Sequence, residues 1–275
     1  MKNLTMLLPQ REFFIKNGEV CRNDKFDQSI FKGRNTVYEV IRLMKGQGLF
    51  LKEHLARLSS SLKKSKISAE VDCEKVKSCI SKLIEVNPGG DGNILFCVTK
   101  TEDLLYIMTW FVQHQYPSAD DYRDGVHIRS MNAMRKNPTA KVWNAPLRNK
   151  TAYLKETDQV FEVLLVDDKK NITECSKSNI FLIRGNRVFT TPAEQVLPGI
   201  TREKVLNICH EQNINVEEKE IPYKELIMYE SVFITGTSPK VLPVRYIDNF
   251  RFNPGNTLLR AIMSAYDDLL FLDLK

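Results

Sequence analysis

The sequence lacks the short motifs that mark several common classes of protein. No Gly-x-Gly-x-x-Gly, Walker, His-Glu-x-x-His or Gly-x-Ser-x-Gly motif is present, so the common nucleotide-binding, metalloprotease and hydrolase classes are not indicated. Only 4 histidines occur in 275 residues, and they do not have the spacing of metal ligands. The 6 cysteines form no Cys-x-x-Cys pair, which argues against a zinc ribbon or a redox motif. We therefore expect no metal site, and we expect the cysteines to be reduced and structural.

Long apolar runs are also missing. The longest apolar stretches resemble strands, as in residues 104–112, whereas a membrane span needs about 20 apolar residues. The chain begins with a short apolar patch that ends at Pro9, followed by Arg11 and Glu12, with no small-residue cleavage site. These features predict a cytoplasmic protein with no membrane partner.

Charge of one sign is only mildly in excess. The net charge of +6 could favour phosphorylated or carboxylate substrates, or it could be solvated surface. The one local cluster of cations, at Lys63, Lys64 and Lys66, has no aromatic residues between its members. It indicates a solvated helix face, so we expect no nucleic-acid partner.

The periodicity of apolar residues predicts a mixture of helices and strands, which is typical of an α+β fold. Leu55, Leu58 and Leu62 recur at helical spacing. Further helices are expected at residues 36–44 (a helix or a helix-ending turn), 74–85, 201–212 and 257–270. Strands are expected at residues 12–20 (a strand or a hairpin), 49–51, 93–100, 104–114, 126–131, 161–166, 180–183, 187–190, 231–235 and 241–247, with a hairpin at 183–187.

A polar segment near the middle of the chain predicts a domain boundary. Residues 115–125 contain a proline and a glycine among polar residues, and 43% hydrophobic content over 275 residues is enough for two cores. We expect a smaller N-terminal α+β domain at residues 1–115, an interdomain linker at 116–123 and a larger C-terminal α+β domain at 124–275.

Five weak motifs occur in one order along the chain. They are TVYEVIR with EHLARL, then KVWN, ITECSKSNIFL, VLPGITREKV and VFITGTSPKVLPV. From about Thr36 to Asp248, this series resembles the fold-type IV (class IV) aminotransferases, which use pyridoxal 5'-phosphate (PLP). That family holds branched-chain aminotransferases, D-amino acid aminotransferases and aminodeoxychorismate lyases. The resemblance implies a two-domain α+β fold with PLP between the domains, in a homodimer.

PLP catalysis asks the protein for a lysine that forms a Schiff base and for a carboxylate that faces the pyridine nitrogen. By the resemblance, the lysine is Lys141, in the family's Lys-x-x-Asn, and the carboxylate is Glu174, 33 residues later. Lys150 is a poorer candidate because it lacks the following asparagine. Burial of Glu174 without a cation would be costly, and a pyridinium would supply that cation.

The coenzyme phosphate needs a cation and backbone N–H groups. Arg57 matches the arginine of the family's His-x-x-Arg-Leu, which implies that it contacts the phosphate. Without the other motifs, the simpler interpretation is an exposed arginine on a helix. The backbone of Ile200 and Thr201, with the Thr201 hydroxyl, would hold the phosphate at the positive end of a helix, which the family resemblance implies. Gly199 would let that loop approach closely; its simpler reading is a strand-to-helix turn that needs conformational freedom.

Further residues are assigned to the substrate by the same resemblance. Gly236, Thr237 and Ser238 match a turn whose hydroxyl serves the phosphate and whose N–H groups serve the substrate carboxylate. The simpler reading of this turn is a plain strand end. Tyr38 matches an aromatic position that lines the substrate pocket, although an aromatic residue after Val37 also suits the core.

The expected reaction is transamination, in which an amino group passes from an amino acid to a 2-oxo acid through a Lys141 Schiff base. We favour branched-chain or other apolar amino acids. Lys100 lies where the D-amino acid enzymes carry an arginine and a histidine, and the lyase's Gly-Arg-Gly run is missing. The alternatives are an aminodeoxychorismate lyase, which eliminates pyruvate to give 4-aminobenzoate, and a non-catalytic scaffold, which Cys175 and Pro146 near the motifs would suit.

Overall fold

The structure is a computed structural model. It describes residues 7–32, 35–69, 71, 73–101 and 104–274. Two features of the sequence fall outside these ranges: part of the apolar start, at residues 1–6, and the turn at 102–103 between two expected strands.

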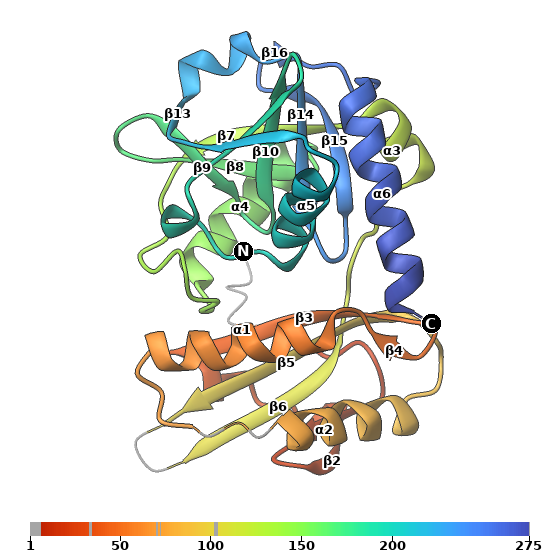
Figure 1. Ribbon diagram of the computed structural model, residues 1–275. Coiled ribbons are helices and arrows are strands. Elements are labelled where there is room, and N and C mark those ends of the chain that lie inside the picture. Colours follow the sequence, from red (N-terminus) through yellow and green to blue (C-terminus); the bar gives the residue numbers. More distant parts are fainter. Residues whose placement is uncertain (1–6, 33–34, 70, 72, 102–103, 275) are drawn as a thin grey trace. The chain divides into compact units, whose positions relative to one another are not determined.

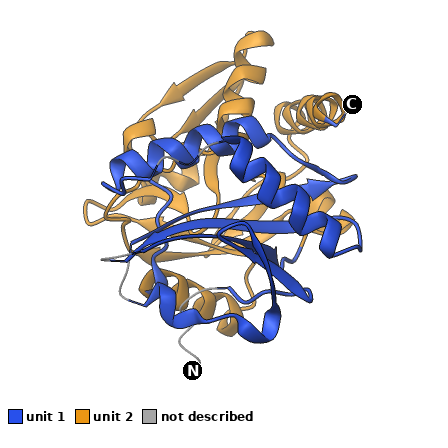
Figure 2. Cartoon of the chain, turned by 90° about the horizontal axis from the view of Figure 1, so that it is seen from below, with its two compact units in different colours: residues 1–115, 140–145, 274 blue, residues 116–139, 146–273, 275 orange. Residues whose placement is uncertain are grey.

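The chain divides into two compact units, which Figure 2 colours separately. Apart from the last two residues, unit 1 comprises residues 1–115 and 140–145, and unit 2 comprises residues 116–139 and 146–273. The chain therefore contributes to unit 1 twice, and the second contribution carries Lys141.

Unit 1 is a six-stranded antiparallel sheet in the order β2-β1-β6-β5-β3-β4 (Figure 1). Side chains alternate along each strand, so Ile94, Phe96 and Val98 pack with the two helices, whereas Leu95 and Cys97 pack on the opposite face. The elements of unit 1 are β1 (Phe13–Lys16), β2 (Glu19–Arg22), β3 (Thr36–Met44), β4 (Gln47–Gly48), α1 (Leu51–Lys64), α2 (Cys73–Val86), β5 (Gly92–Lys100) and β6 (Leu105–Val112).

Two expectations in unit 1 are wrong. Residues 36–44 form strand β3 and not a helix, and residues 49–51 are not a strand, because α1 begins at Leu51. Strand β3 is covered on both faces: Val37 and Ile41 pack with the helices, whereas Tyr38 packs on the other side. A strand covered on both faces shows no clear alternation, so periodicity alone does not distinguish it from a helix.

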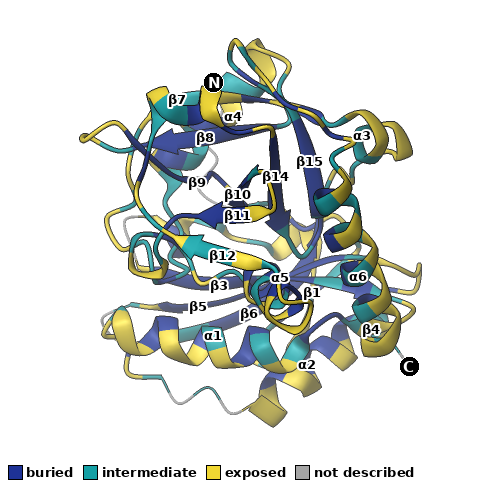
Figure 3. Ribbon diagram, turned by 45° about the horizontal axis from the view of Figure 1, so that its top comes forward, coloured by how far each residue is buried: buried dark blue, intermediate teal, exposed yellow. Residues whose placement is uncertain are grey.

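Unit 2 is a ten-stranded mixed sheet with four helices, and its central strands are buried along most of their length (Figure 3). Strand β7 runs parallel to both β8 and β15. The strands are β7 (Val126–Asn132), β8 (Glu162–Val166), β9 (Asn171–Cys175), β10 (Asn179–Arg184), β11 (Arg187–Thr190), β12 (Asn215–Glu218), β13 (Ile221–Pro222), β14 (Ser231–Gly236), β15 (Lys240–Ile247) and β16 (Phe250–Arg251). The helices are α3 (Ala119–Asp124), α4 (Ala145–Thr157), α5 (Ile200–Glu211) and α6 (Thr257–Asp273).

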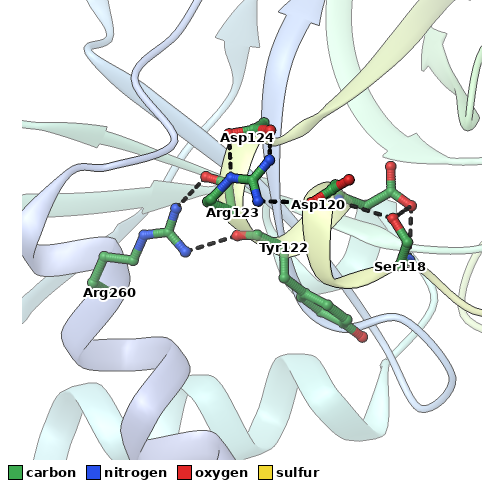
Figure 4. Close-up of polar contacts among 7 residues, drawn as sticks. Ser118, Asp120, Tyr122, Arg123, Asp124 and Arg260 are labelled. Atoms are coloured by element: carbon green, nitrogen blue, oxygen red, sulfur yellow. Dashed lines mark hydrogen bonds and ion pairs between the residues drawn. The ribbon is translucent and has the colours of Figure 1, made fainter.

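The segment expected to be a linker contains helix α3, which is fixed at both ends (Figure 4). At its start, the Ser118 hydroxyl accepts the Asp121 N–H at 3.1 Å, and the Asp121 carboxylate accepts the Ser118 N–H at 2.8 Å. This reciprocal capping box satisfies two N–H groups that a helix start leaves unpaired. At its end, the Arg260 guanidinium of α6 donates to the carbonyls of Tyr122 and Arg123 at 2.7 and 2.6 Å.

The α+β fold class is confirmed, and so are most of the expected elements. The hairpin at residues 183–187 is present, as are the helices expected around Leu58, at 74–85, at 201–212 and at 257–270. Helix α4 and strand β9 were not expected. Within the part of the chain that the structure describes, no helix is both long and apolar enough to cross a membrane.

Candidate active site

Lys141 is anchored to unit 1 by its backbone. Its N–H donates to the Ser61 hydroxyl of α1 at 3.1 Å, and its carbonyl accepts the Tyr38 N–H of β3 at 3.1 Å. The next residue, Val142, forms a β-bridge with Val37. The Lys141 Nζ lies 5.0 Å from the centre of the Tyr38 ring. The structure therefore brings together two residues that the motifs assign to one site.

A buried ionic cluster lies directly beside this lysine segment, on β3 and α1. Arg57 donates from Nε to Glu39 Oε1 at 2.8 Å and from Nη2 to Glu39 Oε2 at 2.6 Å. His54 Nδ1 is 2.8 Å from the same Oε2. Arg57 is 9% exposed and Glu39 is 1% exposed, so the interpretation of Arg57 as an exposed helix arginine is wrong. Such a two-pronged contact fixes the plane of the guanidinium.

The cluster has a defined charge state. Burial would raise the pKa of the Glu39 carboxyl, but the charge and hydrogen bonds of Arg57 and the bond from His54 lower that pKa well below its usual range. Burial lowers the pKa of His54 more than the bond to Glu39 raises it, so the imidazole is neutral. An ionised carboxylate can only accept, so the His54 proton sits on Nδ1. The Nε2 lone pair is then buried and has no hydrogen-bond partner among the described residues.

Glu174 is the centre of a second buried group, in unit 2. Its Oε1 pairs with Arg135 Nε at 2.8 Å, and its Oε2 accepts the Leu197 N–H at 3.3 Å. Arg135 also donates from Nη2 to the Ser176 carbonyl at 2.6 Å. Glu174 is 3% exposed, and the argument that its burial calls for a pyridinium needs correction, because Arg135 already supplies a cation. Arg135 lies in none of the five motifs, so the sequence carried no signal for it.

Helix α5 begins at Ile200, behind Gly199. Gly199 has an ordinary backbone with φ −71°, so the interpretation that this turn needs a glycine's conformational freedom is wrong. The reason is steric: a Cβ on Gly199 would lie 2.0 Å from the Oδ1 of Asn179. Asn179 also donates from Nδ2 to the Leu197 carbonyl at 2.9 Å. Asn179 belongs to the ITECSKSNIFL motif, but the motif by itself assigns no role to it.

The first turn of α5 is buried. Its N-cap residue, Gly199, has no side chain that could cap the helix, and the N–H groups of a first helical turn have no partner within the helix. Ile200 is 4% exposed and Thr201 is 1% exposed. The Thr201 hydroxyl lies 3.2 Å from the Tyr266 hydroxyl of α6, and either group can be the donor.

The Gly236-Thr237-Ser238 turn begins at the last residue of strand β14 and lies near the start of β10. Thr235 pairs directly with Asn179 across these strands. A Cβ on Gly236 would lie 3.1 Å from the ring of Pro239, so the turn is closely packed. Through Asn179 and Leu197, the structure therefore connects Glu174, the start of α5 and this turn in unit 2.

The two residues that favoured a non-catalytic scaffold have ordinary structural roles. Cys175 is fully buried, and burial, with the charges of Glu162 and Glu174, raises the pKa of its thiol well above the usual value. The group is therefore an inert, protonated thiol. Pro146 is the second residue of α4, where the missing N–H of a proline costs the helix nothing. Neither residue disrupts the local structure.

Comparison with known proteins identifies the family. The chain matches the model of the amino-transferase class IV family over residues 36–247. It is 30% identical over 234 residues to a D-alanine aminotransferase of Bacillus licheniformis, covering 80% of this chain and 81% of that protein. It is 27% identical over 269 residues to the branched-chain-amino-acid aminotransferase-like protein 2 of Arabidopsis thaliana, covering 91% of this chain and 48% of that longer protein.

A solved structure of high similarity shows the same fold. The crystal structure of a branched-chain amino acid aminotransferase of Escherichia coli matches with a TM-score of 0.83 and 20% identity, covering 95% of each chain. The chain therefore belongs to the class IV aminotransferases, the fold-type IV enzymes that use PLP.

The described residues fit this coenzyme. Glu174 is a buried carboxylate paired with Arg135, and a carboxylate is the group that suits a protonated pyridine nitrogen. The start of α5 is a helix N-terminus whose N-cap residue, Gly199, has no side chain, which suits a phosphate. Lys141 carries its amine beside an aromatic ring in unit 1. Unit 1 thus contains an amine, and unit 2 contains a carboxylate and a helix N-terminus, which are the kinds of group that bind PLP.

Proposed function

We propose that the protein is an aminotransferase that moves the amino group of an apolar amino acid to a 2-oxo acid, with Lys141 as the Schiff-base lysine. The observation that carries this proposal is the placement of Lys141. A single lysine of the Lys-x-x-Asn motif is fixed by β3 and α1, in contact with Tyr38 and next to the Glu39–Arg57 pair.

The residues that would hold PLP are those that the motifs assign to it. Arg57 and the N–H groups of Ile200 and Thr201 would bind its phosphate, with the Thr237 hydroxyl, and Glu174 would face its ring nitrogen. When bound, PLP supplies the electron sink that makes an amino acid Cα proton removable. The Lys141 amine would take that proton as a general base.

The substrate would lie beside aromatic side chains. Tyr38 and Trp143 pack edge to face with their ring centres 5.2 Å apart, and the Lys141 Nζ lies 5.0 Å from the centre of the Tyr38 ring. Aromatic surfaces favour an apolar substrate side chain. The turn of Gly236, Thr237 and Ser238 would offer N–H groups to the substrate carboxylate. Lys100, at the end of β5, does not reproduce the arginine and histidine of the D-specific enzymes.

A single-turnover experiment tests the function and the substrate class together. Purified protein is loaded with PLP and mixed with a panel of L- and D-amino acids, and changes of the visible absorbance are recorded. We expect the fastest changes with apolar amino acids and a keto acid as product. A colourless protein that takes up no PLP would contradict the proposal, and so would release of 4-aminobenzoate from aminodeoxychorismate.

The reactive lysine can be identified directly. Borohydride reduction of the loaded protein should attach the coenzyme to the peptide that contains Lys141, as shown by mass spectrometry. Lys141→Ala should abolish the attachment. Lys150→Ala is the matched control, because Lys150 is an exposed lysine of α4 close to Lys141 in the sequence. Labelling of Lys150 instead would overturn the assignment.

We further propose a cytoplasmic homodimer, as the family resemblance implies. Light scattering on the PLP-loaded protein should give twice the mass of one chain, and a mass of one chain would contradict the dimer. Fractionation of the cells that produce the protein, followed by immunoblotting, tests its location.

A further inference from the structure

The backbone of Leu197 is held at both its N–H and its carbonyl by side chains of the central sheet of unit 2. Its N–H donates to Glu174 Oε2 at 3.3 Å, and its carbonyl accepts the Asn179 Nδ2 at 2.9 Å. Glu174 belongs to β9 and Asn179 begins β10. Leu197 lies three residues before Ile200, where α5 starts. The backbone of Leu197 therefore ties the segment before α5 to β9, which carries the buried carboxylate, and to β10.

Asn179 also limits how far this loop can shift. Its Oδ1 occupies the space where a Cβ of Gly199 would lie, at 2.0 Å, so the loop backbone rests directly on the amide. Asn179 is 5% exposed, and its strand position opposite Thr235 is fixed by the β10–β14 ladder. The amide therefore has one well-defined position, from which it both bonds Leu197 and supports Gly199.

We propose that Asn179 is a positioning residue that sets the distance between the Glu174 carboxylate and the N–H groups at the start of α5. This inference rests on the proposed function. PLP carries its nitrogen in the ring and its phosphate on a short arm of the same ring, so the distance between the two varies little, and two protein groups that bind these ends must keep a matching separation. A displacement of about 1 Å between the two protein groups is enough to weaken their combined action strongly. Asn179 touches neither end itself; it acts through Leu197 and Gly199.

The test compares PLP with pyridoxal, which has the same ring but no phosphate. Both are titrated into coenzyme-free protein, and the dissociation constants are obtained from tryptophan fluorescence. In the wild type we expect PLP to bind more tightly than pyridoxal. We express this preference as the dissociation constant of pyridoxal divided by that of PLP. In Asn179→Ala this ratio should fall about tenfold, because the loop loses one hydrogen bond and the side chain that supports it. Asn179→Asp keeps the size but loses the donor, and the ratio should fall in the same direction.

The matched control is Thr190→Val. Thr190 is 1% exposed, and its hydroxyl donates to the Ile180 carbonyl at 2.7 Å. This bond joins two strands of unit 2, and not a strand to the loop at residues 197–199. This variant should keep the wild-type ratio. A general loss of stability would weaken both ligands equally and leave the ratio unchanged, so the ratio reports the phosphate end alone.

The outcomes separate the two proposals. A wild type that binds neither ligand overturns the proposed function, and the role of Asn179 with it. A wild type that prefers PLP, with the same preference in both Asn179 variants, overturns only the role of Asn179. Failure of both variants to fold, seen by circular dichroism, also contradicts it, because Asn179 would then support the whole unit. A reduced ratio in both variants and an unchanged ratio in Thr190→Val supports it.

Discussion

The guanidinium of Arg57 donates through two of its nitrogens to both oxygens of the Glu39 carboxylate, at 2.8 and 2.6 Å, in the interior of unit 1. Removal of either side chain would leave the charge of the other one buried without a partner of opposite charge. Because the pair joins β3 to α1, it also fixes the surroundings of Lys141, which bonds both elements.

Replacing Glu39 by glutamine should therefore be strongly destabilising. The Arg57 charge stays buried without its counter-charge, and we expect the free energy of unfolding to fall by about 3 kcal/mol. Urea unfolding of Glu39→Gln measures it. The matched control is Glu74→Gln, which breaks an exposed pair with Lys77 and should cost less than about 1 kcal/mol. Equal losses in the two variants would contradict this account.

The same cluster predicts acid sensitivity in two stages. The pKa values of His54 and Glu39 are both lowered by folding, so the unfolded chain binds more protons and stability falls as the pH falls. The contribution of neutral His54 is complete above its unfolded pKa, about 6.5, and decreases below it. The contribution of Glu39 is complete above about 4.5 and decreases only at lower pH.

Unfolding free energies of the wild type and of His54→Gln, measured by urea from pH 8 to pH 4, test the first stage. The difference between the two proteins should change between pH 7 and pH 5, with the wild type losing more stability over this range. A difference that does not depend on pH would show that His54 does not titrate on unfolding.

The cysteines should differ sharply in reactivity. Cys175 is buried, and the pKa of its thiol is raised, whereas Cys73 is exposed. Native protein treated with iodoacetamide at pH 8 should be labelled at Cys73, with labelling of Cys175 at least tenfold slower. Peptide mass spectrometry reads both sites in one sample. Labelling of both at one rate would mean that Cys175 is accessible, contrary to its position in β9.

Gly199 and Asn179 should be energetically coupled. Gly199→Ala places a methyl group against the Asn179 amide, and we expect a loss of about 1–3 kcal/mol. In an Asn179→Ala background the space is open, so the same change should cost less, which a double-mutant cycle measures. Gly255→Ala is the control, since its Cβ would meet only the end of the Asn253 side chain, at 3.3 Å. Additive effects of the two changes would refute the contact.

Local pattern predicted the elements whose apolar residues have a clear period, such as α1 with Leu55, Leu58 and Leu62. It failed for β3, where Val37 and Tyr38 are buried on opposite faces. The motifs placed Lys141 and Glu174, but not the residues that support them. Arg135 and Glu39 reach their partners only through sheet pairing and helix packing, which no spacing in the sequence records. Asn179 shows the same limit, because its role depends on a loop 18 residues away.

The return of residues 140–145 to unit 1 has a consequence for dissection of the protein. A fragment that ends at residue 115 would have a complete set of unit 1 strands, yet the Tyr38 N–H and the Ser61 hydroxyl would face solvent instead of Lys141. A single crossover near residue 115 therefore does not exchange one whole unit with that of a relative. Such a chimera would take Lys141 from one parent, and the residues that bond its backbone, Tyr38 and Ser61, from the other.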